Sequence, residues 1–134
     1  MARHVRLLPL LPLLGVAACA SGGSDTVATA PRTDLVINYV RDRGAEPERL
    51  TLTCEPAGGT RPDAAQACAD LTEAQEPFAP LPADRSCTEI FGGPQSATVS
   101  GTHRGEPVRL ELSRADGCLI AQWDSLGAVL PPLA

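Results

Sequence analysis

The distribution of the five cysteines constrains this chain more than any other feature of its sequence. One of them, Cys19, follows an apolar N-terminal run, and the other four lie in the body of the chain. These four are Cys54, Cys68, Cys87 and Cys118. An even set of cysteines in a small exported domain predicts two disulfides, which leaves Cys19 for a separate role.

Residues 1–18 have the pattern of an export signal. Two arginines precede the apolar run Leu7–Leu14, and small residues lead from this run to Cys19. The run is too short to cross a bilayer, so we interpret it as a signal peptide. Because Val16-Ala17-Ala18-Cys19 resembles a bacterial lipobox, we expect cleavage before Cys19 and diacylation of Cys19, which would anchor the protein to the cell membrane. The alternative is a normally secreted protein.

Residues 19–33 are small and polar without periodicity, and they predict a flexible tether. The remainder, residues 34–134, is long enough for one domain. Without the leader, nine arginines face sixteen acidic residues, which gives a net charge of −7. The chain has no lysine, and its arginines are scattered rather than clustered. Nucleic acid is therefore an unfavourable partner.

Alternating apolar residues predict two antiparallel hairpins. The strands are expected at residues 34–41, 49–54, 97–101 and 108–113, with a last short strand at 129–130. Apolar residues at helical spacing predict one helix that presents Ala64, Ala67, Cys68 and Leu71 on one face, and a second helix at 118–126. The expected fold is α+β, with an antiparallel sheet of about five strands covered on one side by two helices.

No catalytic or metal-binding motif is recognisable in the sequence. A hydrolytic site needs a nucleophile and a base, and His103 is the only histidine outside the leader. We place His103 in a solvated hairpin turn. The four body cysteines are separated by 13, 18 and 30 residues, without the close pair that structural zinc prefers. We therefore expect no cofactor, no metal and no enzymatic activity.

A series of short motifs, in a fixed order, resembles the streptomycete subtilisin inhibitor family. The motifs are Pro47-Glu48-Arg49-Leu50-Thr51-Leu52-Thr53-Cys54, Gly59-Thr60-Arg61-Pro62, Ala67-Cys68-Ala69-Asp70-Leu71, Cys87-Thr88-Glu89-Ile90-Phe91 and Thr98-Val99-Ser100-Gly101. The resemblance covers about residues 34 to 126. It implies an antiparallel sheet with two helices, the disulfides Cys54–Cys68 and Cys87–Cys118, and often a homodimer.

The resemblance also implies that the protein inhibits subtilisin-like serine proteases through a substrate-like loop. In the family, the scissile bond follows the second residue after the third cysteine, which makes it Glu89–Ile90 in this chain. Ser86, Cys87 and Thr88 would lie on the acyl side of this bond, and Phe91 on the leaving side. Asp116 stands where the family has a residue that supports the loop.

Glu89 differs from the large apolar or basic residues that the family usually has at this position. Burying an unpaired carboxylate in an apolar pocket is costly. A glutamate-selective serine protease is therefore an alternative target to a subtilisin-like one. The rival hypothesis is a non-inhibitory lipoprotein with a surface-binding or structural role that retains the inhibitor fold.

Overall fold

A computed structural model describes residues 32–133 of the chain, so the signal peptide, Cys19 and most of the tether lie outside the described residues. The strands are β1 (Thr33–Val40), β2 (Glu48–Cys54), β3 (Ser96–His103) and β4 (Glu106–Ser113). The helices are α1 (Ala64–Glu73), α2 (Gly117–Ser125) and the short 3₁₀ helix η1 (Gly127–Val129). None of the helices between residues 32 and 133 has the length and apolar character needed to span a membrane.

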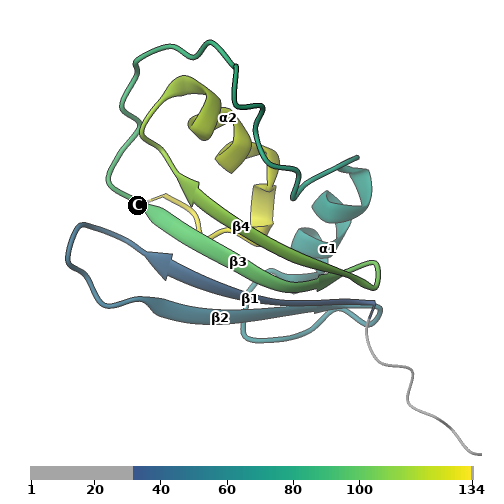
Figure 1. Cartoon of the computed structure of the whole chain (residues 1–134). Coiled ribbons are helices and arrows are strands. Elements are labelled where there is room, and N and C mark those ends of the chain that lie inside the picture. The colour runs from purple at the N-terminus through teal and green to yellow at the C-terminus, as the bar shows by residue number, and fades with distance from the viewer. Residues whose placement is uncertain (1–31, 134) are drawn as a thin grey trace, which may run out of the picture.

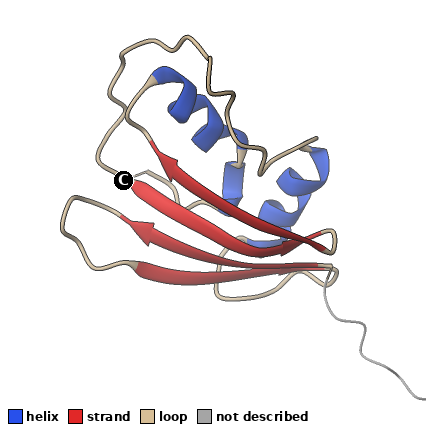
Figure 2. Ribbon diagram, in the orientation of Figure 1, coloured by secondary structure: helices blue, strands red, loops and turns tan. Residues whose placement is uncertain are grey.

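The four strands form one antiparallel sheet in the order β2-β1-β3-β4, with both helices on the same face (Figures 1 and 2). Side chains alternate between the two faces of a strand, and β1 buries Leu35, Ile37 and Tyr39 under the helices while Asp34 is exposed. The two hairpins and the two helices confirm the α+β fold that the sequence predicts.

The helices close the core with a few well-buried side chains. From α1, Ala67 and Leu71 pack on the sheet, and from α2 the only tryptophan, Trp123, lies beside Tyr39 with a ring-centroid separation of 6.2 Å. The disulfide Cys54–Cys68 joins the end of β2 to α1, with a Cα–Cα distance of 5.7 Å. It therefore holds the helix against the sheet, as the family resemblance implies.

The last short strand expected at Val129 and Leu130 is not formed in the structure, and the described residues contain four strands. The reason is that side chains, rather than a neighbouring strand, bind the backbone of this segment. The Arg61 guanidinium donates hydrogen bonds to the carbonyls of Ala128 and Leu130 at 3.0 and 2.9 Å, and the Asp70 carboxylate accepts one from the Ala128 amide at 2.7 Å. The segment therefore turns as η1.

Candidate functional site

The candidate loop, residues 86–92, lies in the long connection between α1 and β3. It contains no helix or strand. Its most exposed apolar side chains are Ile90 and Phe91, which are 59% and 60% exposed. Two adjacent large apolar side chains turned to solvent are unusual unless they form part of a contact surface. The loop therefore presents a small apolar surface beside the acidic Glu89.

The N-terminal side of the candidate loop is attached to the start of α2 at two consecutive residues. Cys87 forms a disulfide with Cys118, with a Cα–Cα distance of 5.4 Å. The next residue, Thr88, accepts a hydrogen bond at its carbonyl oxygen from the Gly117 amide at 2.9 Å. Ser86, Thr88 and Glu89 are otherwise exposed. The backbone just before Glu89 is thus held by one covalent and one hydrogen bond.

The C-terminal side of the loop is attached to Arg114, the residue that follows β4. The Gly92 amide donates a hydrogen bond to the Arg114 carbonyl at 2.7 Å, and the Arg114 Nε donates one to the Gly92 carbonyl at 3.2 Å. Only Glu89, Ile90 and Phe91 lie between the two attachments. One short stretch, residues 114–118, therefore holds the chain on both sides of these three residues.

Asp116 fixes the start of α2 rather than touching the loop through a hydrogen bond of its own side chain. Its carboxylate accepts a hydrogen bond from the Leu119 amide at 2.9 Å, as an N-cap does. The cap leaves the Gly117 amide pointing at Thr88. A carboxylate oxygen of Asp116 lies within 4.8 Å of the sulfurs of Cys87 and Cys118, but sulfurs joined in a disulfide are not thiolate ligands for a metal.

Glu89 makes no ion pair or side-chain hydrogen bond with any of residues 32–133. The ion pairs among residues 32–133 are made by Arg32, Arg109 and Arg114, each with an acid other than Glu89. The carboxylate of Glu89 is therefore free to enter the binding site of another protein without first breaking a contact in this one.

Three residues that hold the loop were not predicted from the sequence: Gly92, Arg114 and Gly117. A Cβ atom at Gly117 would overlap the Thr88 hydroxyl, so a larger residue there would require the Thr88 side chain to turn or the loop to shift. Arg114 continues the inward-facing positions of Leu110 and Leu112 in β4, and it is buried. An arginine in place of an apolar residue in this alternation is the signal that could have identified it.

Comparison with known proteins places the chain in a family. The family described as "Subtilisin inhibitor-like" matches residues 32–115, which include the whole candidate loop. The chain belongs to the subtilisin inhibitor-like family. The match covers more than half of the chain and confirms the resemblance stated from its motifs. The family comprises inhibitors rather than enzymes.

Two relatives illustrate how similar the chain is to other members of the subtilisin inhibitor-like family. "Subtilisin inhibitor-like protein 5" of Streptomyces fradiae is 38% identical over 82 residues, which cover 58% of this chain and 76% of that protein. Plasminostreptin of Streptomyces antifibrinolyticus is 43% identical over 77 residues, covering 54% of this chain and 70% of that one. Among solved structures, Streptomyces caespitosus sermetstatin in complex with Bacillus licheniformis subtilisin is 20% identical, covers 69% of this chain and 94% of that chain, and has a TM-score of 0.43.

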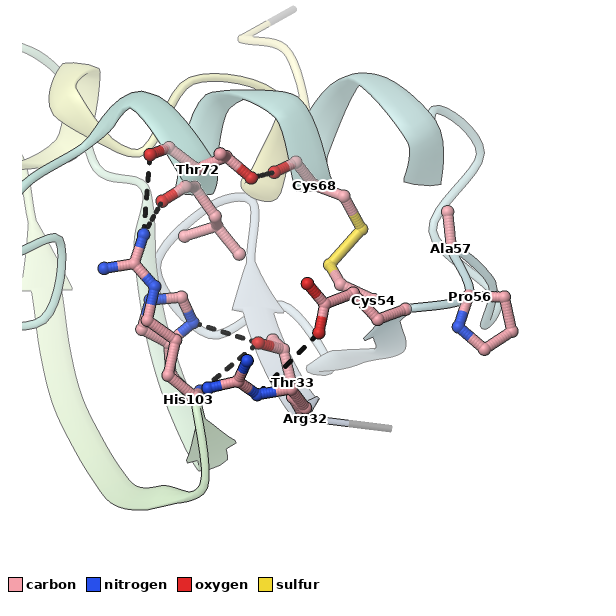
Figure 3. A pocket seen from close by; sticks show the side chains of 11 residues that line it. Arg32, Thr33, Cys54, Pro56, Ala57, Cys68, Thr72 and His103 are labelled. Atoms are coloured by element: carbon pink, nitrogen blue, oxygen red, sulfur yellow. Dashed lines mark hydrogen bonds and ion pairs between the residues drawn. A yellow bond between two sulfur atoms is a disulfide. The ribbon is translucent and has the colours of Figure 1, made fainter. Parts of the chain in front are cut away.

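A second feature, at the opposite end of the sheet, corrects the prediction for His103. This residue ends β3 and is partly buried in the wall of a cavity of about 240 Å³, whose other walls include the Cys54–Cys68 disulfide and Thr72 (Figure 3). Its Nδ1 lies 3.1 Å from the Thr33 hydroxyl, and its ring meets Phe78 edge-on at 5.2 Å between centroids. His103 is therefore a packed residue and not a solvated one.

The environment of His103 disfavours its charged form. Burial lowers the pKa of its imidazole below the ordinary value of 6.5, and the nearby positive charge of Arg104 lowers it further. The Nε2 atom is buried without a hydrogen-bond partner among the described residues. Among residues 32–133 its imidazole is hydrogen-bonded to the Thr33 hydroxyl and packs against Phe78, and from this packing we assign His103 a role in stability.

Proposed function

We propose that this member of the family inhibits a serine protease by presenting the Glu89–Ile90 bond as a substrate. The observation that carries the proposal is the attachment of the loop on both sides of an exposed tripeptide. Cys87 and Thr88 are held on one side and Gly92 on the other, all by residues 114–118. An exposed segment held between two fixed points is accessible to a protease as a substrate would be, and we expect it to bind in an extended shape.

The proposed mechanism follows from this preorganisation. A loop already held in its bound shape loses little conformational entropy on binding, so more of the interaction energy appears as affinity. If the protease cleaves Glu89–Ile90, the new amine of Ile90 stays close to the acyl carbon, because Gly92 remains bound to Arg114. Religation then competes with release, and the protease is occupied rather than supplied with a substrate.

Glu89 makes a glutamate-selective serine protease the favoured target. Its carboxylate is exposed and free of partners between residues 32 and 133. A pocket with an arginine or histidine would bind it through charge-assisted hydrogen bonds, which are stronger than neutral ones. The apolar pocket of a subtilisin-like enzyme would instead have to desolvate an unpaired charge.

Residues 20–134, expressed with both disulfides intact, would be titrated against a subtilisin, a trypsin-like enzyme and a glutamate-selective serine protease. We expect strongest inhibition of the last. The Glu89→Met variant should lose that inhibition and gain inhibition of subtilisin, by roughly a hundredfold each from desolvation and pairing energies of a few kcal/mol. The matched control is Glu106→Met, because Glu106 is also an exposed glutamate but lies in the β3–β4 hairpin, away from the candidate loop. It should change the inhibition of neither protease. Absence of inhibition throughout, in wild type and Glu89→Met, would favour the non-inhibitory lipoprotein.

The proposal includes an extracytoplasmic location and a lipid anchor at Cys19. The described chain begins at Arg32, beside the β3–β4 hairpin, whereas the candidate loop lies at the other end of the sheet (Figure 1). An anchored domain could thus present the loop on the side away from its tether. Metabolic labelling with a palmitate analogue should mark the full chain and spare Cys19→Ser. Equal labelling of both would refute the anchor and favour simple secretion.

The homodimer implied by the family remains part of this proposal. The sheet face opposite the helices carries Val36 and Val40, both half-buried, among small polar side chains such as Thr98 and Ser100. Sedimentation velocity of residues 20–134 over a wide concentration range would distinguish a dimer from a monomer.

A further inference from the structure

Arg114 is the most enclosed charged group next to the candidate loop. Its side chain is 10% exposed, and the residue stands at an inward-facing position just beyond β4. A charged group is rarely buried unless it is paired and hydrogen-bonded, because desolvation of the charge is costly. The contacts that compensate this cost identify what the guanidinium does.

Three contacts fix the guanidinium of Arg114. Its Nη1 donates to the Asp124 carboxylate at 3.1 Å, and its central carbon lies 5.8 Å from the centroid of the Trp123 ring. With the group held by an ion pair on one side and an aromatic face on the other, its Nε points at the Gly92 carbonyl at 3.2 Å. Asp124 and Trp123 both belong to α2, so the helix orients the arginine and the arginine holds the loop.

A second buried arginine, Arg61, makes the same kind of contact away from the candidate loop and provides a comparison. Arg61 is also buried, with 5% of the whole residue exposed against 9% for Arg114, and it also donates to backbone carbonyls. Those carbonyls belong to the C-terminal segment around η1, which is attached to α1 rather than to residues 86–92. The two arginines therefore make similar contacts with different segments.

We propose that Arg114 is a positioning residue for the leaving side of the reactive loop. Its side chain keeps Gly92 in place, and with it the segment Ile90-Phe91, before and after cleavage of Glu89–Ile90. The consequence of this positioning, religation of the cleaved bond, rests on the proposed function. The positioning itself can be measured without a protease.

The first test is hydrogen–deuterium exchange of the chain from residue 20 to residue 134. Arg114→Met removes the donor and keeps an unbranched stem over Trp123. We expect backbone amides in the peptide covering 89–95 to exchange about tenfold to a hundredfold faster than in wild type, as the loss of a charge-assisted hydrogen bond predicts. Arg61→Met is the matched control and should leave this peptide unchanged. Equal exchange in wild type and Arg114→Met overturns the inference.

Should Arg114→Met fail to fold, Asp124→Ala carries the test, because Asp124 is 63% exposed and its loss removes only the ion pair that orients the guanidinium. The same peptide should then exchange faster, by a smaller factor than for Arg114→Met, and unchanged exchange again overturns the positioning role.

The second test measures the consequence with a glutamate-selective protease. Arg114→Met should be cleaved at Glu89–Ile90 at least tenfold faster than wild type at equal protease, and its equilibrium ratio of cleaved to intact chain should rise. Arg61→Met should match wild type in both. Faster loop exchange without any change in cleavage overturns the role in religation. If wild type itself inhibits no protease while exchange responds to Arg114→Met, the positioning role stands and the proposed function fails.

Discussion

The Gly117 amide donates a hydrogen bond to the Thr88 carbonyl at 2.9 Å, and the residues next to them, Cys118 and Cys87, are joined by a disulfide. Two neighbouring residues of the loop are thus attached to two neighbouring residues of α2. A single attachment would leave the loop free to rotate about it. Two consecutive attachments fix both the position and the direction of the backbone that enters Glu89.

The first prediction concerns the space between Gly117 and Thr88. In Gly117→Val, the new side chain takes the space of the Thr88 hydroxyl, so we expect the Thr88 side chain to turn and the loop to shift, which lengthens the hydrogen bond. Loss of one such bond and its geometry costs about 1 kcal/mol or more, and we expect inhibition to weaken about fivefold to tenfold. The inhibition constant against the best target protease measures this.

Ala115→Val is the matched control for Gly117→Val, because Ala115 is exposed and lies in the same stretch of chain. It should inhibit as wild type does. Equal inhibition by all three proteins would mean that the approach of the loop to α2 has no part in binding.

The second prediction separates the two disulfides. The chain-entropy model gives about 3 kcal/mol for the Cys54–Cys68 loop and about 3.7 kcal/mol for the Cys87–Cys118 loop, so both double Cys→Ser variants should lose similar stability. Only the variant without Cys87–Cys118 should also become a rapidly cleaved substrate, because its loop loses a covalent attachment beside Glu89. Urea unfolding and a cleavage time course at Glu89–Ile90 measure the two effects.

In this comparison the Cys54/Cys68 variant serves as the control for lost stability alone. Slow cleavage of both variants would show that the hydrogen bonds of Thr88 and Gly92 suffice to hold the loop. Rapid cleavage of both would show that general unfolding, and not the local attachment, exposes the bond.

Much of the fold could be predicted because it depends on local patterns. Alternation in residues 34–40 and helical spacing in residues 64–71 each determine which side chains face the core. Local patterns could not show that the strand expected at Val129 and Leu130 does not form. The conformation of this segment depends on Arg61 and Asp70, which lie far away in the sequence and bind its backbone through their side chains.

The candidate site divides in the same way. Cys87, Glu89 and Cys118 could be proposed because the family motif gives their spacing, and the structure contains the Cys87–Cys118 disulfide. Arg114 breaks the apolar alternation of β4, but its contact with Gly92, like that of Gly117 with Thr88, joins segments more than twenty residues apart, and such an approach leaves no periodic pattern. His103 lies at the end of β3, in the predicted hairpin, but the prediction that it is solvated was wrong for a related reason, since Phe78 and Thr33 cover it from other elements.

The third prediction concerns acid stability and Asp70. The backbone hydrogen bond from Ala128, helped by one from Gln66, lowers the pKa of the Asp70 carboxyl below its ordinary value of 3.8. A carboxyl with a lowered pKa in the folded state contributes stability that is present above the unfolded pKa and is lost as pH falls through the folded pKa. Asp70→Asn should therefore unfold with a shallower pH dependence below about pH 4, measured by urea midpoints. A slope equal to that of wild type would contradict the role of Asp70.

The last prediction uses His103 as the only histidine outside the leader. Burial, and secondarily Arg104, lower the pKa of its imidazole in the folded state. The unfolded chain then binds a proton more readily, so stability is fully present above the unfolded pKa of 6.5 and is lost as pH falls from there toward the folded pKa.

His103→Gln, in residues 20–134, should remove most of the change in unfolding free energy between about pH 7.5 and about pH 5. Urea unfolding followed by fluorescence of the single tryptophan, Trp123, measures this change, since that ring is 4% exposed in the fold. Asp70→Asn is the control, because its carboxyl titrates below this window, and it should keep the dependence of wild type. If His103→Gln keeps that dependence too, the imidazole is not the group whose burial links folding to pH.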